Sequence, residues 1–416
     1  MEAAVSPPRL GTPAAATISL GNLEIDHNVF GVRIAMRPVE LSFFEFELMR
    51  VLSEQLDRVL PYDALTNVLW SATGRNETRR LQVLVHRLLS GAEGQPERVI
   101  VFSRDEAKQH ALRVQYGHQF AATDEVIYRN FQRILQFWIG DVRDFHSVAA
   151  ALRDVDIAIN AAALKQVPTC EYFPFEAVQT NIGGPQNIVR AIQEHNLPVQ
   201  VVAGVSTDKA CKPVNAMGMT KALQERVFVQ GNLACPQTRF VCVRYGNVLA
   251  SRGSVIPLFH EQIRQGGPVT ITTRDMTRFL LSLEEAADTV FTAIRDGLPG
   301  ETYVPQVPSA RVTDIAAVLI GERQIEQVVT GIRPGEKVHE ILVSEEEVHR
   351  TVQRGKYFTI LPLLPELRRS DAGPTVLEKE YSSSDQPMTF AQTLALLQAR
   401  RLMVEDIGDA PIELLR

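Results

Sequence analysis

The 416-residue chain has few cysteines, no long hydrophobic run and no strong excess of one charge. The cysteines lack C-x-x-C spacing, which argues against zinc and for buried free thiols in a reducing compartment. No apolar run reaches the roughly 20 residues of a membrane helix, and the N-terminus lacks the basic-then-apolar order of a signal peptide. The net charge of −6 gives no general attraction to nucleic acid or anionic membrane. We therefore expect a cytoplasmic protein with no metal site and no membrane contact.

A glycine-rich phosphate-binding turn is also missing. From residue 98 onward, apolar β-branched runs such as "RVIVFS", "VDIAINAA" and "VQVVAGVS" alternate with helical segments. This alternation predicts an α/β fold with a Rossmann-like, doubly wound parallel sheet. Such a sheet normally opens with a central strand followed by G-x-x-G-x-x-G, yet no such motif precedes Arg98. We expect either a gap in the strand ladder or direct pairing of strands that ordinarily do not touch.

The segment before residue 98 has a different pattern. Residues 1–16 are rich in proline and alanine and are predicted to be a disordered tail. Short alternating stretches over 17–36 predict antiparallel strands, and helices are expected from Ser42, over 60–70 and over 76–89. The predicted organisation is a small α+β domain over 17–95 and an α/β domain over 96–416. Within the latter, the Rossmann part covers about 96–250, and a small C-terminal substrate lobe is expected to be interleaved over about 251–416.

The stretch "STDKACKPVNAMGMTK", residues 206–221, has the highest density of chemically active side chains. It follows a predicted strand, and open α/β sheets bind their ligands at the carboxyl ends of their strands. Asp208 and Lys209 are either a general acid and base with shifted pKa values or an ion pair in a solvated loop. Met217 and Lys221 share one helical face, where a methionine alone is more typical of a core.

Eight motifs over 98–416 carry a family resemblance. In order, they are "VFSRDEAKQ", "IGDVRD", "AAALKQVPTCEYFPFEAVQTNIGG", "STDKACKPVNAMGMTK", "VRYGNVLASRGSVIP", "DMTRF", "IRPGEKVHE" and "KEYSS". This region resembles the UDP-N-acetylglucosamine 4,6-dehydratase and CapD-like polysaccharide-biosynthesis family of extended short-chain dehydrogenases/reductases. The resemblance implies oxidation at sugar C4, elimination of water across C5 and C6, and reduction at C6. It also implies a homo-oligomer.

The resemblance assigns catalytic roles by position. Thr207 and Ser206 would hold the C4 hydroxyl, Asp208 would protonate the leaving C6 hydroxyl, and Lys209 would take the C5 proton. Lys221 matches the lysine of the superfamily's YxxxK motif, and Met217 stands in the tyrosine position. Because a thioether cannot accept a proton, C4 deprotonation would fall to Lys221, Lys209 or water.

Binding residues follow from the same resemblance. Arg104 would meet an adenosine 2′-phosphate, which favours NADP over NAD as the cofactor. Asn160 replaces the histidine that the family has before "AAALK". The other predicted dinucleotide contacts are Ser103, Asp141, Val142, Ala161, Ala162, Lys165 and Lys221. The contacts to UDP-N-acetylglucosamine or a related UDP-sugar are Ser206, Asn247, Arg252, Arg278, Arg333 and Glu336.

Residues 17–90 resemble a second family. "PVELSFFEFELMRVL" and "TRRLQVLVHRL" are similar to the OmpR-type winged-helix effector domain. In that family the helix over 76–89 enters the DNA major groove, which would make Arg75, Arg79, Arg80 and Arg87 contacts to DNA. Residues 1–95, however, hold nine arginines, no lysine and eleven acidic residues, and a net charge of −2 does not favour binding to a duplex. A protein-interaction module is the preferred alternative.

Three hypotheses about function follow. The first is a nucleotide-sugar 4,6-dehydratase, a lyase of surface-polysaccharide biosynthesis whose activity could be impaired by loss of the phosphate loop. The second is a catalytically inactive binder of UDP-sugar or a DNA-binding regulator that uses the winged-helix-like domain. The third is a recombined chain without a selected function.

Overall fold

The computed structural model describes residues 17–20, 23–26, 31–34, 37–39, 75–118, 133–249, 255–332, 335–368 and 373–407. It divides into two compact units, Met1–Arg75 and Asn76–Arg416. None of the helices in these ranges is long and apolar enough to cross a membrane.

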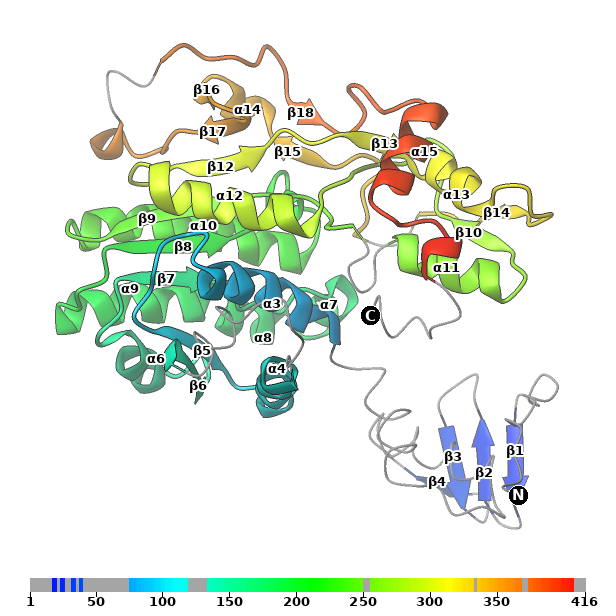
Figure 1. Ribbon diagram of the computed structural model, residues 1–416, viewed down its shortest axis with the longest axis horizontal. Helices are drawn as coiled ribbons and strands as arrows, with labels where there is room; N and C mark the ends of the chain where they lie inside the picture. Colours follow the sequence, from blue (N-terminus) through cyan, green and yellow to red (C-terminus); the bar gives the residue numbers. More distant parts are fainter. Residues whose placement is uncertain are drawn as a thin grey trace. The chain divides into compact units, whose positions relative to one another are not determined.

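The first unit contains a four-stranded antiparallel meander, as predicted for residues 17–36 (Figure 1). Its strands are β1 (Thr17–Leu20), β2 (Leu23–Asp26), β3 (Gly31–Ile34) and β4 (Arg37–Val39). The tail over 1–16 and the helices expected from Ser42 and over 60–70 lie outside the described residues. The winged-helix resemblance of this segment therefore stays a prediction.

The second unit is built around a six-stranded sheet, and its parallel core is the doubly wound arrangement that the sequence predicted. The strands β7, β8, β9 and β12 run parallel, and β17 and β16 complete the sheet antiparallel to them. In spatial order they are β16 (Thr351–Arg354), β17 (Tyr357–Ile360), β12 (Thr302–Pro305), β9 (Arg239–Val243), β8 (Val201–Val205) and β7 (Ile157–Asn160).

Helices cover both faces of this sheet because successive strand side chains point to opposite sides. On one face, Val202 packs in a cluster with α6 (Phe145–Leu152), α9 (Gly184–His195) and α10 (Ala216–Ala234). On the other face, Val201 and Ala203 pack with α12 (Leu283–Asp296). The continuous apolar runs of the sequence are thus explained by burial on both sides.

The expected gap in the ladder is present. β5 (Val99–Ser103) and β6 (Leu135–Ile139) form a separate parallel pair, and among the described strands β5 shares no ladder with β7 (Figure 1). The predicted alternative, direct pairing across the missing strand, is therefore wrong. Helix α4 (Glu106–His118) follows β5, as the sequence predicted.

Helix α3 (Arg75–Ser90) belongs mainly to the second unit, which begins at Asn76 and not near residue 96 as expected. The physical reason is its apolar face. Val85 and Leu89 pack with β5 and β6, whereas Leu84 and Leu88 reach the cluster of α12 and the six-stranded sheet. The helix predicted to enter DNA thus contacts both sheets on either side of the gap.

The C-terminal lobe is assembled from short elements around its own apolar cluster. Its strand pairs are β10 (Val269–Ile271) with β14 (Gln327–Val329) and β11 (Thr277–Phe279) with β13 (Ser309–Arg311). Its helices are α11 (Val255–Arg264), α13 (Val312–Ile320) and α15 (Phe390–Ala399). The pair β15 (Ile341–Val343) and β18 (Tyr381–Ser382) packs instead with β12 and β17 of the six-stranded sheet, and α14 (Glu345–Val348) follows β15. The remaining short helices of the unit are α7 (Val167–Tyr172), α8 (Pro174–Val178), η1 (Gln179–Gly183), η2 (Asp208–Ala210), η3 (Pro365–Leu367) and η4 (Glu405–Ile407).

Candidate active site

The chain turns sharply at the carboxyl end of β8, where the candidate catalytic residues begin. Thr207 has extended backbone angles and caps η2, its side chain accepting from the Lys209 N–H. The backbone N–H groups of Ser206 and Asp208 donate at 2.7 and 3.2 Å to the carbonyls of Val243, the last residue of β9, and of Tyr245, just after it. These bonds fix the turn against the neighbouring strand, so Asp208 is held inside the protein.

Asp208 and Lys209 form an ion pair in which Asp208 is buried and Lys209 is partly exposed. The side chain of Asp208 is 1% exposed, and its Oδ1 lies 3.1 Å from Lys209 Nζ. Thr207 Oγ1 donates to the same oxygen at 2.7 Å. Oδ2 is buried and accepts no hydrogen bond from the described residues. A solvated loop pair is thereby excluded, and one carboxylate oxygen remains for a ligand or a proton.

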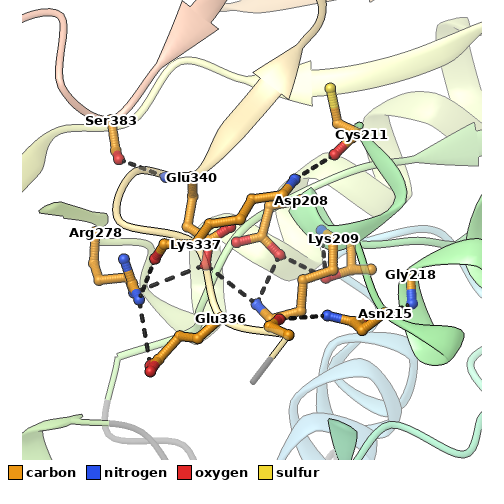
Figure 2. A network of polar contacts seen from close by, with 12 residues as sticks. Asp208, Lys209, Cys211, Asn215, Gly218, Arg278, Glu336, Lys337, Glu340 and Ser383 are labelled. Carbon is orange, nitrogen blue, oxygen red and sulfur yellow. Dashed lines mark hydrogen bonds and ion pairs between the residues drawn. The ribbon is translucent and has the colours of Figure 1, made fainter. Parts of the chain in front are cut away.

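A second carboxylate completes the group (Figure 2). Glu340 Oε1 lies 3.7 Å from Lys209 Nζ and 3.8 Å from Arg278 Nε. Figure 2 shows Asp208, Lys209, Arg278 and Glu340 directed toward one another from three segments that are far apart in the sequence. Glu340 lies inside "IRPGEKVHE" but was not among the predicted site residues; no local signal distinguishes it from an exposed glutamate. We call these four residues the catalytic cluster.

Burial and charge act against each other on the titration of this cluster. Burial acts to raise the pKa of Asp208, but Lys209 and the Thr207 hydroxyl hold it below its usual value. Burial acts to lower the pKa of Lys209, but Asp208 and Glu340 hold it above its usual value. Burial, and then repulsion from Asp208, raise the pKa of Glu340. The resting site therefore holds a charged Asp208–Lys209 pair beside a carboxyl that takes up a proton more easily than usual.

Helix α10 brings Lys221 and Met217 to the same site. Its cap is Asn215, whose side chain accepts from the Gly218 N–H at 2.8 Å. A Cβ at Gly218 would lie 2.2 Å from the Lys209 carbonyl oxygen, so glycine is what lets the helix approach η2 this closely. Lys221 Nζ donates to the Val205 carbonyl at 2.6 Å, and burial lowers its pKa to about 8. Met217 is buried, so its position fits both core packing and the predicted tyrosine position.

A turn of π-helix supplies a positioning residue that sequence reasoning missed. Asn181, in η1, is fully buried; its Oδ1 accepts from the Leu164 N–H at 2.7 Å and its Nδ2 donates to Thr220 Oγ1 at 2.9 Å. It thereby fastens the "AAALK" segment to α10, next to Lys221. Single π turns inside helices often occur at functional sites.

Ser206 makes a different contact from the one predicted. Its hydroxyl donates to Glu225 Oε1 at 2.5 Å, so its hydrogen is engaged and only its oxygen lone pairs stay available to a substrate hydroxyl. Glu225 in turn accepts two bonds from Arg244, which also binds Glu347. We call Ser206, Glu225, Arg244 and Glu347 the structural cluster. None of its last three members was predicted, because a buried arginine has no local sequence signature.

A cavity of about 2120 Å³ joins the gap beside β5 to the catalytic cluster. It is lined by Thr207, Lys209, Met217 and Lys221, whereas Asp208 lies just behind this wall. All predicted dinucleotide contacts line it, namely Ser103, Arg104, Asp141, Val142, Ala161, Ala162, Lys165 and Lys221. Arg104 is 54% exposed and its Nη1 lies 3.4 Å from Asp141 Oδ2, so these two predicted dinucleotide contacts are neighbours.

The predicted sugar-nucleotide contacts are placed unevenly. Ser206, Asn247, Arg278 and Glu336 line the cavity, whereas Arg252 and Arg333 lie outside the described residues. Arg278 donates to the carbonyls of Thr277, Val338 and Lys337 at 2.7, 3.0 and 3.1 Å. These bonds make Arg278 a support of the 336–340 loop, which weakens its predicted role as a free grip for diphosphate.

The predicted DNA contacts are only partly described. Arg87 binds Asp288 of α12 at 2.6 Å and also Glu93, so its guanidinium is committed within the second unit. The side chains of Arg79 and Arg80 lie outside the described residues. Within the described ranges, no three histidine, cysteine or acidic side chains gather as a metal site would require. All four cysteines are buried and free, as predicted.

Comparisons with known proteins agree with this geometry. Residues 82–362 match the family described as polysaccharide biosynthesis protein. Over 270 residues the chain is 40% identical to a UDP-N-acetylglucosamine 4,6-dehydratase (inverting) of Campylobacter jejuni, covering 64% of this chain and 75% of that one. It is also 40% identical over 283 residues to a UDP-glucose 4-epimerase of Rickettsia typhi, covering 67% and 78%.

A solved structure extends the likeness to three dimensions. The X-ray structure of Pen from Bacillus thuringiensis superposes with a TM-score of 0.67 at 29% identity, covering 78% of this chain and 94% of that one. The family match begins inside α3, which agrees with the packing of that helix in the second unit. The chain belongs to the polysaccharide biosynthesis protein family.

Proposed function

We propose that this protein is a nucleotide-sugar 4,6-dehydratase acting on a UDP-N-acetylhexosamine. The observation that carries the proposal is the Asp208–Lys209 ion pair, whose lysine lines the same cavity as Lys221. Oxidation at C4 alone needs one base and a hydride acceptor. A second acid–base couple next to that site is what elimination of water across C5 and C6 requires.

The hydrogen bond between Thr207 and Asp208 supports a route for the first proton. Met217 cannot accept it, whereas Thr207 Oγ1 already donates to Asp208 Oδ1 at 2.7 Å. With the C4 hydroxyl bound to Thr207, its proton passes through the threonine hydroxyl to the Asp208 carboxylate. Asp208 then holds the proton that it donates to the departing C6 oxygen. Lys209, as the neutral amine, takes the C5 proton and returns it once C6 has been reduced.

The lining of the cavity supports a nicotinamide dinucleotide as the cofactor, NADP in preference to NAD. When bound, this group supplies hydride acceptance at C4 and hydride return at C6. Arg104 and Asp141 would hold its adenosine end, and Lys221 its nicotinamide ribose. Its pyrophosphate usually binds the turn after the first strand, and no described strand fills that place between β5 and β7. We therefore expect weaker dinucleotide binding than in relatives with the turn.

A UDP-sugar 4-epimerase is the second candidate, because several related proteins carry that name. An epimerase returns the hydride to C4 and leaves C5 and C6 unchanged. The same incubation separates the two: UDP-N-acetylglucosamine and NADP are added to the purified protein, and products are analysed by mass spectrometry and chromatography. A product lighter by one water supports the dehydratase, and an isomer of unchanged mass supports the epimerase.

The controls make the result specific. Lys209→Gln removes the C5 base and should abolish the lighter product, whereas Glu345→Gln changes a carboxylate whose side chain is 71% exposed and should retain it. Neither product from the unmodified chain, over a range of NADP and NAD concentrations, would refute both candidates.

A further inference from the structure

Glu340 is the member of the catalytic cluster to which the proposed reaction gives no role. It precedes β15, is 3% exposed and lines the cavity. Its backbone N–H donates to Ser383 Oγ at 2.9 Å, which fixes the residue between β15 and β18. Its Oε1 lies 3.7 Å from Lys209 Nζ, and its Oε2 is buried without a hydrogen-bond partner among the described residues. A buried carboxylate oxygen without a donor is costly unless it takes up a proton or binds a ligand.

The charged groups around Glu340 come from three segments. Asp208 and Lys209 face it from η2, Arg278 from β11, and Lys337 from its own loop, while Glu336 acts on it through Arg278. Burial and Asp208 raise the pKa of Glu340, and the three cations oppose this. Glu340 is therefore the carboxyl of the cluster that gains a proton more easily.

This inference rests on the proposed reaction, in which Lys209 acts as a base although it is charged in the resting site. Lys209 is held as an ammonium by two carboxylates, but it must be a neutral amine to take the C5 proton. Arrival of the C4 proton at Asp208 removes one of those two carboxylates. The Lys209 side chain is 23% exposed, and Glu340 is 3% exposed. Proton transfer from this partly buried ammonium to the one remaining carboxylate is favoured, because it removes the charge of a buried carboxylate.

We propose that Glu340 receives the proton that Lys209 must lose before it can act as the C5 base. One N–H bond of the Lys209 ammonium breaks, and one O–H bond forms on the Glu340 carboxylate. The products are a neutral amine and a neutral carboxylic acid, so net charge is conserved and no electrons change hands. When Asp208 gives up its proton to the C6 oxygen and Lys209 takes the C5 proton, the Asp208–Lys209 ion pair forms again. Once Lys209 has returned that proton to C5, Glu340 gives its own proton back to the amine, and the resting charges are restored. Glu340 is thus a positioning residue that acts through Lys209.

The pH dependence of kcat tests this proposal, and the direction of the change is decisive. In the unmodified protein kcat falls at low pH only when bulk water protonates Glu340 beforehand. In Glu340→Gln the lysine proton has to leave for bulk water, so the acidic limb follows Lys209, an amine with an ordinary pKa of 10.5. We expect the limb to move upward by a unit or more, which makes the variant about tenfold slower or worse near neutral pH. If Glu340 acted only through its charge, Glu340→Gln would lower the pKa of Lys209, and the acidic limb would move to lower pH instead.

Graded and control variants keep the test informative. Glu340→Asp keeps a carboxyl but withdraws it by one methylene, so its acidic limb should lie between those of the unmodified protein and Glu340→Gln. If Glu340→Gln does not fold, Glu340→Asp takes its place in the test. Glu345→Gln should leave the profile unchanged. A limb that stays in place or moves to lower pH in Glu340→Gln would overturn the proposal.

A second measurement does not depend on turnover and separates this proposal from the proposed function. Infrared difference spectra of the full chain, recorded against pH, report the carbonyl stretch of a buried carboxylic acid. A band that is absent in Glu340→Gln and titrates above the ordinary glutamic acid value of 4.5 supports the proposal. A midpoint at or below 4.5 overturns it. If the unmodified chain makes no dehydrated product, the proposed function fails, and this titration alone decides whether Glu340 can hold a proton at working pH.

Discussion

The structural and catalytic clusters contain the same kinds of groups, yet they are built differently. In the structural cluster all five N–H donors of Arg244 have acceptors: both Glu225 oxygens, both Glu347 oxygens and the Leu342 carbonyl, at 2.7–3.1 Å. In the catalytic cluster the ion pairs of Lys209 and Arg278 span 3.1–3.8 Å, and one oxygen each of Asp208 and Glu340 has no partner among the described residues.

This difference indicates what each cluster does. A closed network holds its charges in one state, because moving any proton would leave a buried group unpaired. An open network keeps acceptors available for a substrate or a proton, and perturbed carboxyls beside a cavity are typical of catalytic sites. The structural cluster also holds Ser206, so it fixes the turn from which Thr207, Asp208 and Lys209 project.

Breaking the closed cluster should have the largest effect on stability. Arg244→Met leaves the Glu225 carboxylate buried without its cation and Glu347 with only the Arg350 contact at 3.3 Å, which costs about 3–5 kcal/mol. Urea unfolding at neutral pH measures this loss. Arg244→Lys is the informative control, because an ammonium keeps the charge but cannot reproduce the two forked contacts. If Arg244→Met lowers the unfolding free energy by less than about 1 kcal/mol, the structural cluster does not stabilise the fold as proposed.

Breaking the open cluster should affect activity much more than stability. Asp208→Asn keeps the shape of the side chain but can no longer carry the C4 proton to the C6 oxygen. We expect kcat to fall about 10²–10⁴-fold, the range for loss of a general acid–base group. The unfolding free energy should fall by less than in Arg244→Met, because Lys209 is partly exposed and keeps Glu340 as a counter-ion. Equal losses of stability in Asp208→Asn and Arg244→Met would erase the distinction between the clusters.

The sheet could be predicted from the sequence because its determinants are local. Runs such as "VQVVAGVS" alternate with helical segments, and burial on both faces leaves that pattern wherever the strand lies. The gap was foreseen as one of two outcomes. The packing of α3 was not, because its apolar face fits a winged helix as well as a sheet. Only the contacts of Val85 and Leu84 with two different clusters identify its partner.

The site could be predicted only where its residues are neighbours in sequence. Thr207, Asp208, Lys209, Met217 and Lys221 share one short motif and were found together. Glu340 reaches Lys209 from more than a hundred residues away, and Ser206, although it lines the cavity, donates its hydroxyl hydrogen to Glu225 on α10. Such contacts depend on tertiary packing, for which a single sequence has no local pattern.

Acid should weaken the closed cluster over a defined pH range. Burial acts to raise the pKa of Glu347, but Arg244 and the Ser344 N–H lower it from 4.5 to about 2. Because the folded pKa is lowered, this carboxylate stabilises the protein above pH 4.5, and its contribution is lost as the pH falls toward 2. The contribution is at most about 3 kcal/mol. In urea unfolding, Glu347→Gln should be less stable at pH 7, and its difference from the unmodified chain should shrink below pH 4.5. A difference that is independent of pH would contradict this assignment.

Cys211 lies between the two clusters, and the change expected in the alkylation of its thiol is the smallest of the predicted effects. Its Sγ lies 3.9 Å from Glu347 Oε2, and its carbonyl accepts from Lys337 Nζ at 2.5 Å, so it touches the closed cluster on one side and the loop of Glu340 on the other. Burial raises the pKa of its thiol to about 12, so only about one thiol in ten thousand is ionised at pH 8.

We expect negligible alkylation of Cys211 in the native protein and in Glu340→Gln, measured by peptide mass spectrometry. Arg244→Met should make it react at concentrations of urea too low to unfold the unmodified chain, because the packing that buries the thiol depends on the closed cluster. Rapid alkylation in Glu340→Gln would show instead that the open cluster carries this packing.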